Sequence, residues 1–197
     1  MINMLEIYTD GSCSTNLRKG GWGYVVLDNE VVKHEDCGAE DDTTNNRMEL
    51  TALLKGIQWV ENNFLYAKDV VVYTDSSYIA NCFKEEWYKR WRSNGWRTAN
   101  RVAVKNQDLW REILNLYERG THNIEIVYVK GHAENKWNNS ILSLYLLFQF
   151  LSISVSSCDN RLNTLSADVL SIIFLTPTCS ALSTGTITLI SPGILKI

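Results

Sequence analysis

Short apolar runs, rich in β-branched residues, recur along the first two-thirds of the chain and predict strands. Two of these runs are nearly continuous, as in strands that are buried on both faces of a sheet. The first leads to Asp10 and is followed at once by Gly11, where we expect the strand to end, and another leads into Asp75. The expected strands are residues 4–10, 20–28, 31–38, 69–75 and 124–129.

A helical period follows the third expected strand. Four apolar residues recur at the three- and four-residue spacing of one helical face: Leu50, Leu53, Ile57 and Val60. This pattern predicts a helix over about residues 46–61. Further helices are expected from Ser76, an N-cap candidate, to about residue 83, and from about 106 to 119. Strands and helices in this order predict an α/β layered domain.

Glycine and turn residues indicate how the second strand is placed. Asp28 and Asn29 form a good turn pair between the second and third strands. Gly20, Gly21 and Gly23 permit a close backbone approach or unusual dihedral angles where the second strand begins.

Three carboxylates are expected to converge at one edge of the sheet. Asp10 and Asp75 would lie at strand ends, where an α/β sheet opens its crevice. Glu49 lies one turn before Leu53, at the edge of the helical face that packs on the sheet. Like charges at this proximity resist ionisation unless a cation joins them. Clusters of oxygen ligands suit Mg²⁺ or Mn²⁺, and a pair of such ions serves phosphoryl displacement.

These acids also have a structural interpretation. An Asp after a strand commonly starts a turn. Asn46 and Glu49 have the spacing of a relaxed capping box at a helix start. The capping role and the metal-ligand role of Glu49 are compatible with each other.

Charge is distributed unevenly along the chain, although the net charge is only −3. Residues 28–42 carry seven acidic residues against Lys33, whereas residues 84–105 carry seven Lys or Arg against two Glu. A local basic block on a mildly acidic chain predicts a negatively charged partner that docks at one place.

Aromatic and basic side chains alternate within residues 84–105. This pattern suits binding to nucleic acid through its backbone and sugars, and the candidate binding residues are Trp87, Lys89, Arg90, Trp91, Arg92, Trp96 and Arg97. The alternative is a solvated amphipathic helix whose tryptophans belong to the core. Trp87 and Trp91 are four residues apart, so one of them can pack inward.

Composition changes abruptly near Asn139. Residues 1–139 hold all seven tryptophans and no proline, whereas residues 140–197 hold both prolines, no tryptophan and only four charged residues. We therefore expect one domain over residues 1–139, an apolar insertion over 140–157, and an atypical tail over 158–197 that begins with a remnant of a helix at 158–168.

Six short motifs, in order, resemble those of the type 1 ribonuclease H family. They are TDGS (9–12), GGWG (20–23), TTNNRMEL (43–50), YTDSSY (73–78), VKNQDLW (104–110) and VKGH (129–132). The resemblance covers roughly residues 3–139. It implies a three-layer ribonuclease H-like fold, with a five-stranded mixed sheet and helices on both faces.

The resemblance also implies an activity and a set of site residues. The expected reaction is hydrolysis of the RNA strand of RNA–DNA hybrids with two Mg²⁺ ions, or Mn²⁺ in their place, leaving a 5′-phosphate and a 3′-hydroxyl. Asp10, Glu49 and Asp75 would bind the metals, and His132 would assist proton transfer or product release. Residues that would touch the sugar-phosphate backbones are Asn16, Thr44, Asn45, Asn46 and Asn106. Asn45 and Asn46 can equally be helix caps.

The family's fourth acid is displaced in this chain. Its position falls at Leu142, inside the apolar run 141–157, and the next Asp is Asp159. Removal of that run would restore the family pattern, so Asp159 is the candidate fourth ligand. The run is a retained intron, a genuine insertion that loops out, or the start of out-of-frame translation at Ser140. A membrane anchor at 141–155 is a weak alternative, because the run is short for a span.

Two other classes of function stay open beside the enzyme. One is a catalytically impaired module that only binds hybrids, and the other is a non-functional product of a disrupted reading frame. The five cysteines form no CxxC pair, which fits the cytoplasm or another reducing compartment, with nucleus and organelles left open. We expect a monomer.

Overall fold

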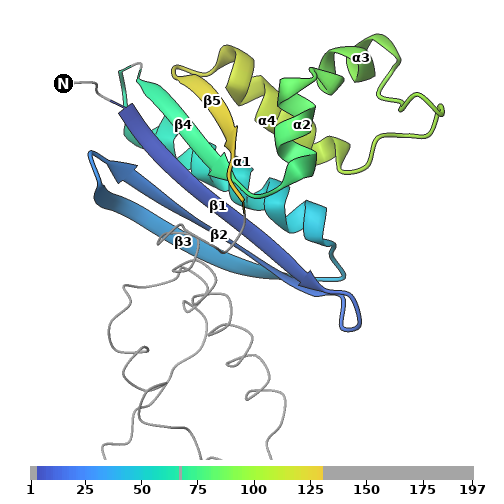
Figure 1. The fold of residues 1–197 in the computed structure, drawn as a ribbon, viewed down its shortest axis with the longest axis horizontal. Helices are drawn as coiled ribbons and strands as arrows, with labels where there is room; N and C mark the ends of the chain where they lie inside the picture. Colours follow the sequence, from blue (N-terminus) through green and yellow to red (C-terminus); the bar gives the residue numbers. More distant parts are fainter. Residues whose placement is uncertain (1–3, 67, 131–197) are drawn as a thin grey trace, which may run out of the picture.

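The computed structural model describes residues 4–66 and 68–130, which form one sheet with helices packed against it (Figure 1). The strands are β1 (Met4–Ser14), β2 (Lys19–Asp28), β3 (Val31–Asp41), β4 (Asp69–Thr74) and β5 (Asn123–Tyr128). The helices are α1 (Asn45–Asn63), α2 (Ser77–Lys84), α3 (Trp87–Ser93) and α4 (Gln107–Arg119).

The sheet has five strands in the order β3-β2-β1-β4-β5. The first three strands pair antiparallel, whereas β4 pairs parallel with both β1 and β5. The parallel pairs need crossovers, which α1 and the α2–α4 segment supply. The predicted α/β class with a five-stranded mixed sheet is confirmed.

Strand β1 is longer than the sequence predicts. It continues through Gly11 to Ser14, pairing Gly11 with Trp22 and Ser14 with Lys19 of β2. Pairing with β4 stops earlier, at Thr9 opposite Thr74. The expectation that β1 ends at Asp10 is therefore wrong. Beyond the point where β4 stops, pairing with β2 in the antiparallel hairpin still satisfies the backbone hydrogen-bonding groups of β1. A single glycine does not break a strand that has a partner on one side.

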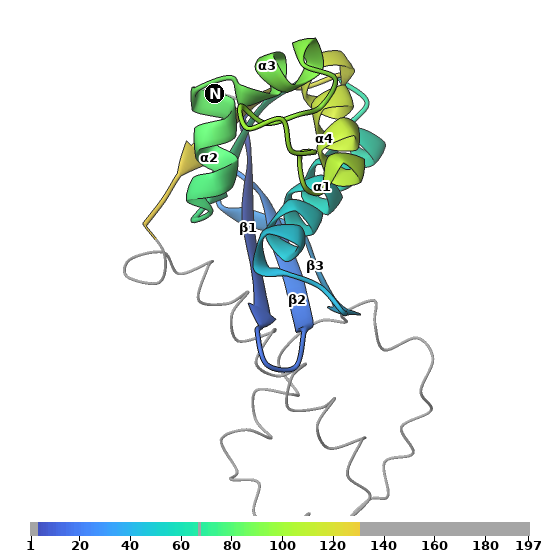
Figure 2. The ribbon, with the colours of Figure 1, turned by 90° about the vertical axis from the view of Figure 1, so that its right-hand side faces the viewer.

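One face of the sheet carries the main hydrophobic core. Leu5, Ile7 and Val72 point into the same buried cluster as Leu53 of α1 and Trp110 of α4. Figure 2 shows α1 and α4 together on one side of β1 and β2. The opposite face carries a small cluster formed by Tyr8, Val25 and Leu27, with Tyr73 against it. A helix on that second face, as the family fold implies, would have to come from outside the described residues.

The local signals at turns and helix starts are partly confirmed. Asn29 and Glu30 have φ values of 52° and 63°, as a tight hairpin turn requires. The Ser76 side chain accepts a hydrogen bond from the Ile79 N–H, so Ser76 caps α2 as predicted. Helix α1, however, is capped by Thr44, whose side chain accepts from the Arg47 N–H. The capping-box interpretation of Asn46 and Glu49 is therefore wrong.

Across the described ranges, no helix is long and apolar enough to cross a membrane. The anchor alternative at 141–155, the insertion 140–157 and the tail 158–197 all lie outside the described residues.

Candidate active site

The parallel register of β1 and β4 brings Asp10 and Asp75 to the same level, where the pairing of these two strands ends. Thr9 pairs with Thr74, so the next residue along each segment is an aspartate: Asp10 lies within β1, and Asp75 directly follows β4. The Thr9 hydroxyl donates to the Tyr73 carbonyl at 3.3 Å and ties the two strands together at this level. Both aspartates are half-buried. The adjacency that the two strand patterns predicted is present.

Helix α1 approaches β1 closely because residue 11 is a glycine. A Cβ atom at Gly11 would lie 2.7 Å from Glu49 Cα and closer still to the backbone of Met48 and Glu49. Any side chain at position 11 would therefore push the first turns of α1 off the strand. Gly20 has a related role, since a Cβ there would lie 2.6 Å from Met48 Cγ. These two glycines place Glu49 beside Asp10.

Asn45 orients the Glu49 carboxylate. Its side-chain amide donates to Glu49 Oε1 at 3.0 Å, and its carbonyl oxygen accepts from the Cys13 N–H at 3.0 Å. Asn45 thus links the end of β1 to the start of α1. The other carboxylate oxygen, Glu49 Oε2, is buried and has no hydrogen-bond partner.

The environment of Glu49 raises its pKa from 4.5 to about 7. Burial is the largest cause, and the negative charges of Asp75 and Asp10 act in the same direction. The nearby Ser76 hydroxyl partly opposes them, since it favours the ionised carboxylate. The charges of Asp10 and Asp75 therefore disfavour the ionised form of Glu49.

The donor set fits a hard divalent cation, although the side chains are not arranged around one point. Within the described ranges, no three His, Cys, Asp or Glu side chains form a ready metal site. The site nevertheless has all-oxygen donors, mutual repulsion and a buried carboxylate oxygen without a partner. Carboxylates that repel one another separate until a cation neutralises them. Asp10, Glu49 and Asp75 are the residues that would hold it.

The polar residues expected at the nucleic-acid backbone come from three parts of the chain: the β1–β2 turn and the starts of α1 and α4. Thr44, Asn45 and Asn46 are exposed at the start of α1, and Asn16 is exposed in the β1–β2 turn. Asn106 is half-buried at the start of α4 with a φ of 54°, and its side chain makes no cap hydrogen bond. Thr44 is the N-cap of α1, so neither Asn45 nor Asn46 caps this helix. The Asn45 side chain bonds Glu49 instead.

The tryptophans of the basic segment belong largely to the core. Trp91 and Trp96 are each only 8% exposed and join the main cluster, while Trp87 packs against it half-buried. Trp91 also makes an edge contact with Trp110, at 5.6 Å between ring centroids. The packing interpretation therefore holds for Trp91 and Trp96, whose faces are not available to stack on a base. The spacing of aromatic residues along a helix does not show whether a given ring is buried or exposed.

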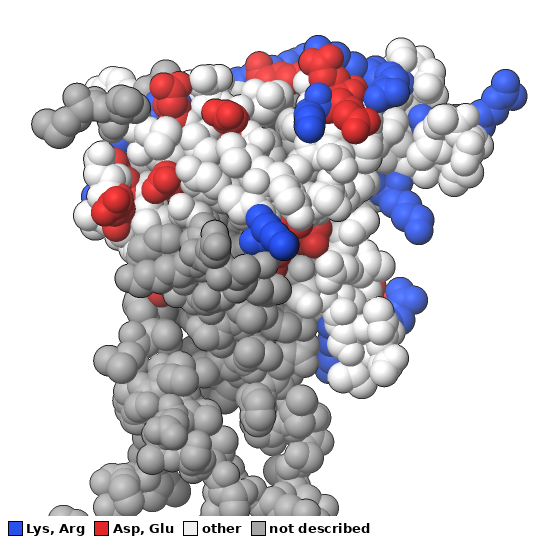
Figure 3. Space-filling model, in the orientation of Figure 1, with Lys and Arg blue, Asp and Glu red and all other residues white. Residues whose placement is uncertain are grey.

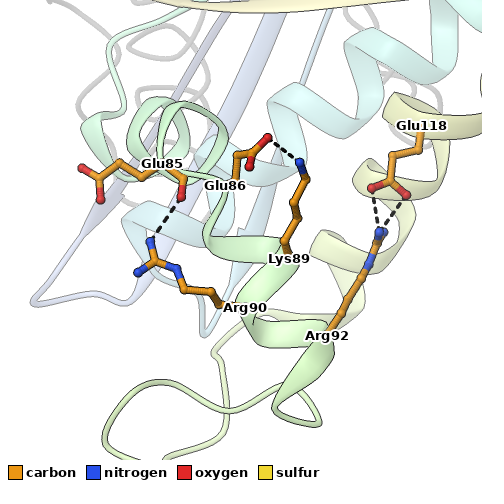
Figure 4. A network of polar contacts seen from close by, with 6 residues as sticks. All are labelled: Glu85, Glu86, Lys89, Arg90, Arg92 and Glu118. Carbon is orange, nitrogen blue, oxygen red and sulfur yellow. Dashed lines mark hydrogen bonds and ion pairs between the residues drawn. The ribbon is translucent and has the colours of Figure 1, made fainter.

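The basic side chains of α3 differ in how they are held (Figure 4). Arg92 makes two hydrogen bonds to the Glu118 carboxylate, at 2.6 and 2.7 Å, and so points toward α4. Lys89 pairs with Glu86, and Arg90 donates to the Glu85 carbonyl at 3.2 Å. Lys89 and Arg90 are both exposed. Lys89 and Arg92 each pair with a glutamate, whereas none of the ion pairs found among the described residues involves Arg90.

The loop after α3 carries further exposed cations. Arg97, Arg101 and Lys105 are exposed, and Arg97 donates to the Arg101 carbonyl at 2.8 Å. In Figure 3, Lys and Arg side chains stand out on the projecting right-hand end of the molecule, where this loop lies in Figure 1. The predicted basic surface is present, but it is built by exposed cations without the two buried tryptophans.

Two predicted site residues, His132 and Asp159, lie outside the described residues. Two contributors were missed by the sequence reasoning. The Ser76 hydroxyl was assigned only to a helix cap, and Asn45 only to a cap or a substrate contact. The four-residue spacing of Asn45 and Glu49 on one helix face was the available signal for their hydrogen bond.

Comparison with known proteins gives the class of this fold and site. The family model described as RNase H matches residues 3–142. The ribonuclease H of Prosthecochloris aestuarii is 46% identical over 139 residues, which is 71% of this chain and 90% of that protein. The ribonuclease H of Thermoanaerobacter sp. (strain X514) is 44% identical over 138 residues, 70% of this chain and 84% of that protein.

Solved structures agree with this assignment. LC9-RNase H1, described as a type 1 RNase H with the type 2 active-site motif, superposes with a TM-score of 0.62 at 27% identity, over 74% of this chain and 72% of that one. A foamy viral protease-reverse transcriptase in complex with RNA/DNA hybrid shares the fold, with a TM-score of 0.60 at 22% identity, over 76% of this chain and 20% of that one. The chain belongs to the ribonuclease H family, so it is a nuclease, as expected from its motifs.

Proposed function

We propose that the chain hydrolyses the RNA strand of RNA–DNA hybrids with divalent metal ions held by Asp10, Glu49 and Asp75. The observation that carries the proposal is the position of Asp10 and Asp75 beside a largely buried Glu49: burial, and then the charges of the two aspartates, raise the pKa of Glu49 to about 7. The two aspartate charges beside Glu49 destabilise its ionised form in the metal-free protein. The arrangement of the three acids is explained by a cation that they share.

The side chains at this site have different roles. Asp10 on β1 and Asp75 directly after β4 provide carboxylates, and Asn45 binds Glu49 Oε1, which leaves the buried Oε2 without a hydrogen-bond partner. Glu49 must release its proton before it can bind a cation. Asp10, Glu49 and Asp75 would hold two Mg²⁺ ions, or Mn²⁺ in their place, and these ions would supply activation of the attacking water and charge stabilisation at the leaving 3′-oxygen, so that the products would carry 5′-phosphate and 3′-hydroxyl ends.

The exposed cations support a nucleic-acid substrate. Lys89, Arg90, Arg97 and Arg101 lie on α3 and the following loop, apart from the acids. Cations at this position can hold the phosphates of a duplex, while Asn16 and Asn46 lie exposed and can contact 2′-hydroxyls of the RNA strand. The placement of His132 and Asp159 at the same site belongs to the proposal and rests on the motif alone.

The Asp10→Asn variant tests the proposal. We expect metal-dependent cleavage of a hybrid to be lost, while binding of the hybrid in EDTA stays equal or improves, because one repulsive charge is removed. Asp69→Asn is the matched control, since Asp69 is exposed at the start of β4, at the opposite end of that strand from Asp75. If Asp10→Asn cleaves at the parent rate, the metal-site assignment is wrong. If the parent binds hybrids but cleaves none at any Mg²⁺ or Mn²⁺ concentration, the chain is a binding module.

A further inference from the structure

A cavity of about 470 Å³ lies between the end of α3 and the outer face of α4. Its lining is mostly charged and polar: Arg92, Trp96, Arg111, Asn115, Glu118 and Arg119. Cavities of this size accommodate small molecules. It shares no residue with the three acids of the candidate active site.

The guanidinium groups in this cavity are not equally neutralised. Arg92 and Glu118 hold each other through two hydrogen bonds of 2.6 and 2.7 Å, so their charges cancel. None of the ion pairs found within residues 4–66 and 68–130 involves Arg111 or Arg119. The cavity therefore has two positive charges in excess.

The Arg111 guanidinium stacks on the Trp96 ring and forms no ion pair with a carboxylate of the described residues. Its guanidinium carbon lies 4.3 Å from the centroid of the Trp96 ring. Stacking on an aromatic face fixes the plane of the guanidinium while its N–H groups stay available as donors. Trp96 is itself held in the core at 8% exposure, which makes it a rigid support. A pre-oriented guanidinium with free donors is a typical phosphate-binding group.

We propose that this cavity binds a phosphate group, with Arg111 and Arg119 as the charged ligands and the Asn115 amide as a further donor. Arg119 lies in the last turn of α4, where the helix dipole is unfavourable for an anion. Two uncompensated guanidinium charges outweigh the partial charge of a helix end. The phosphate belongs either to a free nucleotide or to the backbone of a nucleic acid that extends beyond the active site. The proposal does not depend on the carboxylate chemistry.

The test uses the full chain and the double variant Arg111→Gln/Arg119→Gln. The matched control is Lys33→Gln/Lys55→Gln, which removes two positive charges from exposed positions on β3 and α1. Adenosine 5′-diphosphate is titrated into each protein by calorimetry in EDTA at fixed ionic strength. We expect the parent and the control to bind alike and the double variant to bind at least about tenfold more weakly. Equal affinity in all three proteins, or no binding to the parent together with unchanged hybrid binding, overturns the proposal.

Hybrids of two lengths identify the source of the phosphate. One hybrid covers only the active site, and the other extends past α4. If the double variant weakens binding of the long hybrid alone, the ligand is the nucleic-acid backbone, whereas a loss limited to the diphosphate identifies a free nucleotide. The single variant Arg119→Gln, which leaves the Arg111–Trp96 contact intact, is expected to show the same direction of change if the double variant does not fold.

Discussion

Replacement of Glu49 by glutamine should stabilise the metal-free protein most at high pH. The folded-state pKa of Glu49 is raised by burial and by the charges of Asp75 and Asp10, to about 7 from an ordinary value of 4.5. A carboxyl with a raised pKa contributes stability at low pH that is lost as pH rises through the folded value. At pH 8 the parent must therefore hold an ionised Glu49 in an unfavourable site, and the Glu49→Gln variant does not.

The size of the effect follows from the two pKa values. The interval from 4.5 to about 7 corresponds to about 3 kcal/mol at full ionisation, as an order of magnitude. Part of this difference is already present at pH 5, so the gain of Glu49→Gln over the parent should grow by about 2 kcal/mol between pH 5 and pH 8. The glutamine amide leaves an unpartnered N–H₂ near the position of Oε2, but this cost does not depend on pH.

Urea unfolding followed by tryptophan fluorescence, in EDTA at pH 5 and pH 8, measures this difference. Glu125→Gln on β5 is the matched control, since it removes an exposed carboxylate and reports any general effect of net charge. The same variant should lose metal-dependent cleavage. If the stability difference between Glu49→Gln and the parent is equal at the two pH values, the carboxylates do not interact as described and the reasoning fails.

Three further outcomes are expected. Gly11→Ala should lower the free energy of unfolding by about 1–3 kcal/mol and reduce cleavage, because a Cβ at position 11 collides with the α1 backbone. Gly95→Ala has open space but a φ of 64°, so this control should destabilise the protein through backbone strain without reducing cleavage; an equal loss of cleavage in the two variants would contradict this. Lys89→Ala/Arg90→Ala should lower the salt slope of hybrid binding by about 1–2 with little change in the single-turnover rate, since both side chains are exposed; an unchanged slope would exclude phosphate contacts. Deletion of residues 141–157 should raise solubility and lower the Mg²⁺ concentration needed for cleavage, and Asp159→Asn in the deleted chain should reverse that gain; if neither change alters the Mg²⁺ titration, Asp159 is not a ligand.

Much of the candidate site was determined by the sequence alone. Two β-branched runs that each lead into an aspartate specify parallel strands, and the register then places Asp10 and Asp75 together. The helical period of α1 puts Glu49 at the boundary of its buried face. These features are local, since strand and helix periods and turn residues depend on neighbours within a few positions. For that reason the order and class of the elements were also predictable.

Only the tertiary structure decided which side chains are available and how the acids behave. Trp91 and Trp96 lie in the core, and Arg92 is paired with Glu118 on another helix, although all three have the sequence context of binding residues. The pKa of Glu49 depends on burial and on two charges from distant strands. Burial and charge environment are sums over residues far apart in the chain, and a sequence pattern reports only the period along it. The close approach of Gly11 to Glu49 could not be predicted from the sequence either. It is a contact between β1 and α1, and a local sequence pattern describes each of these elements alone.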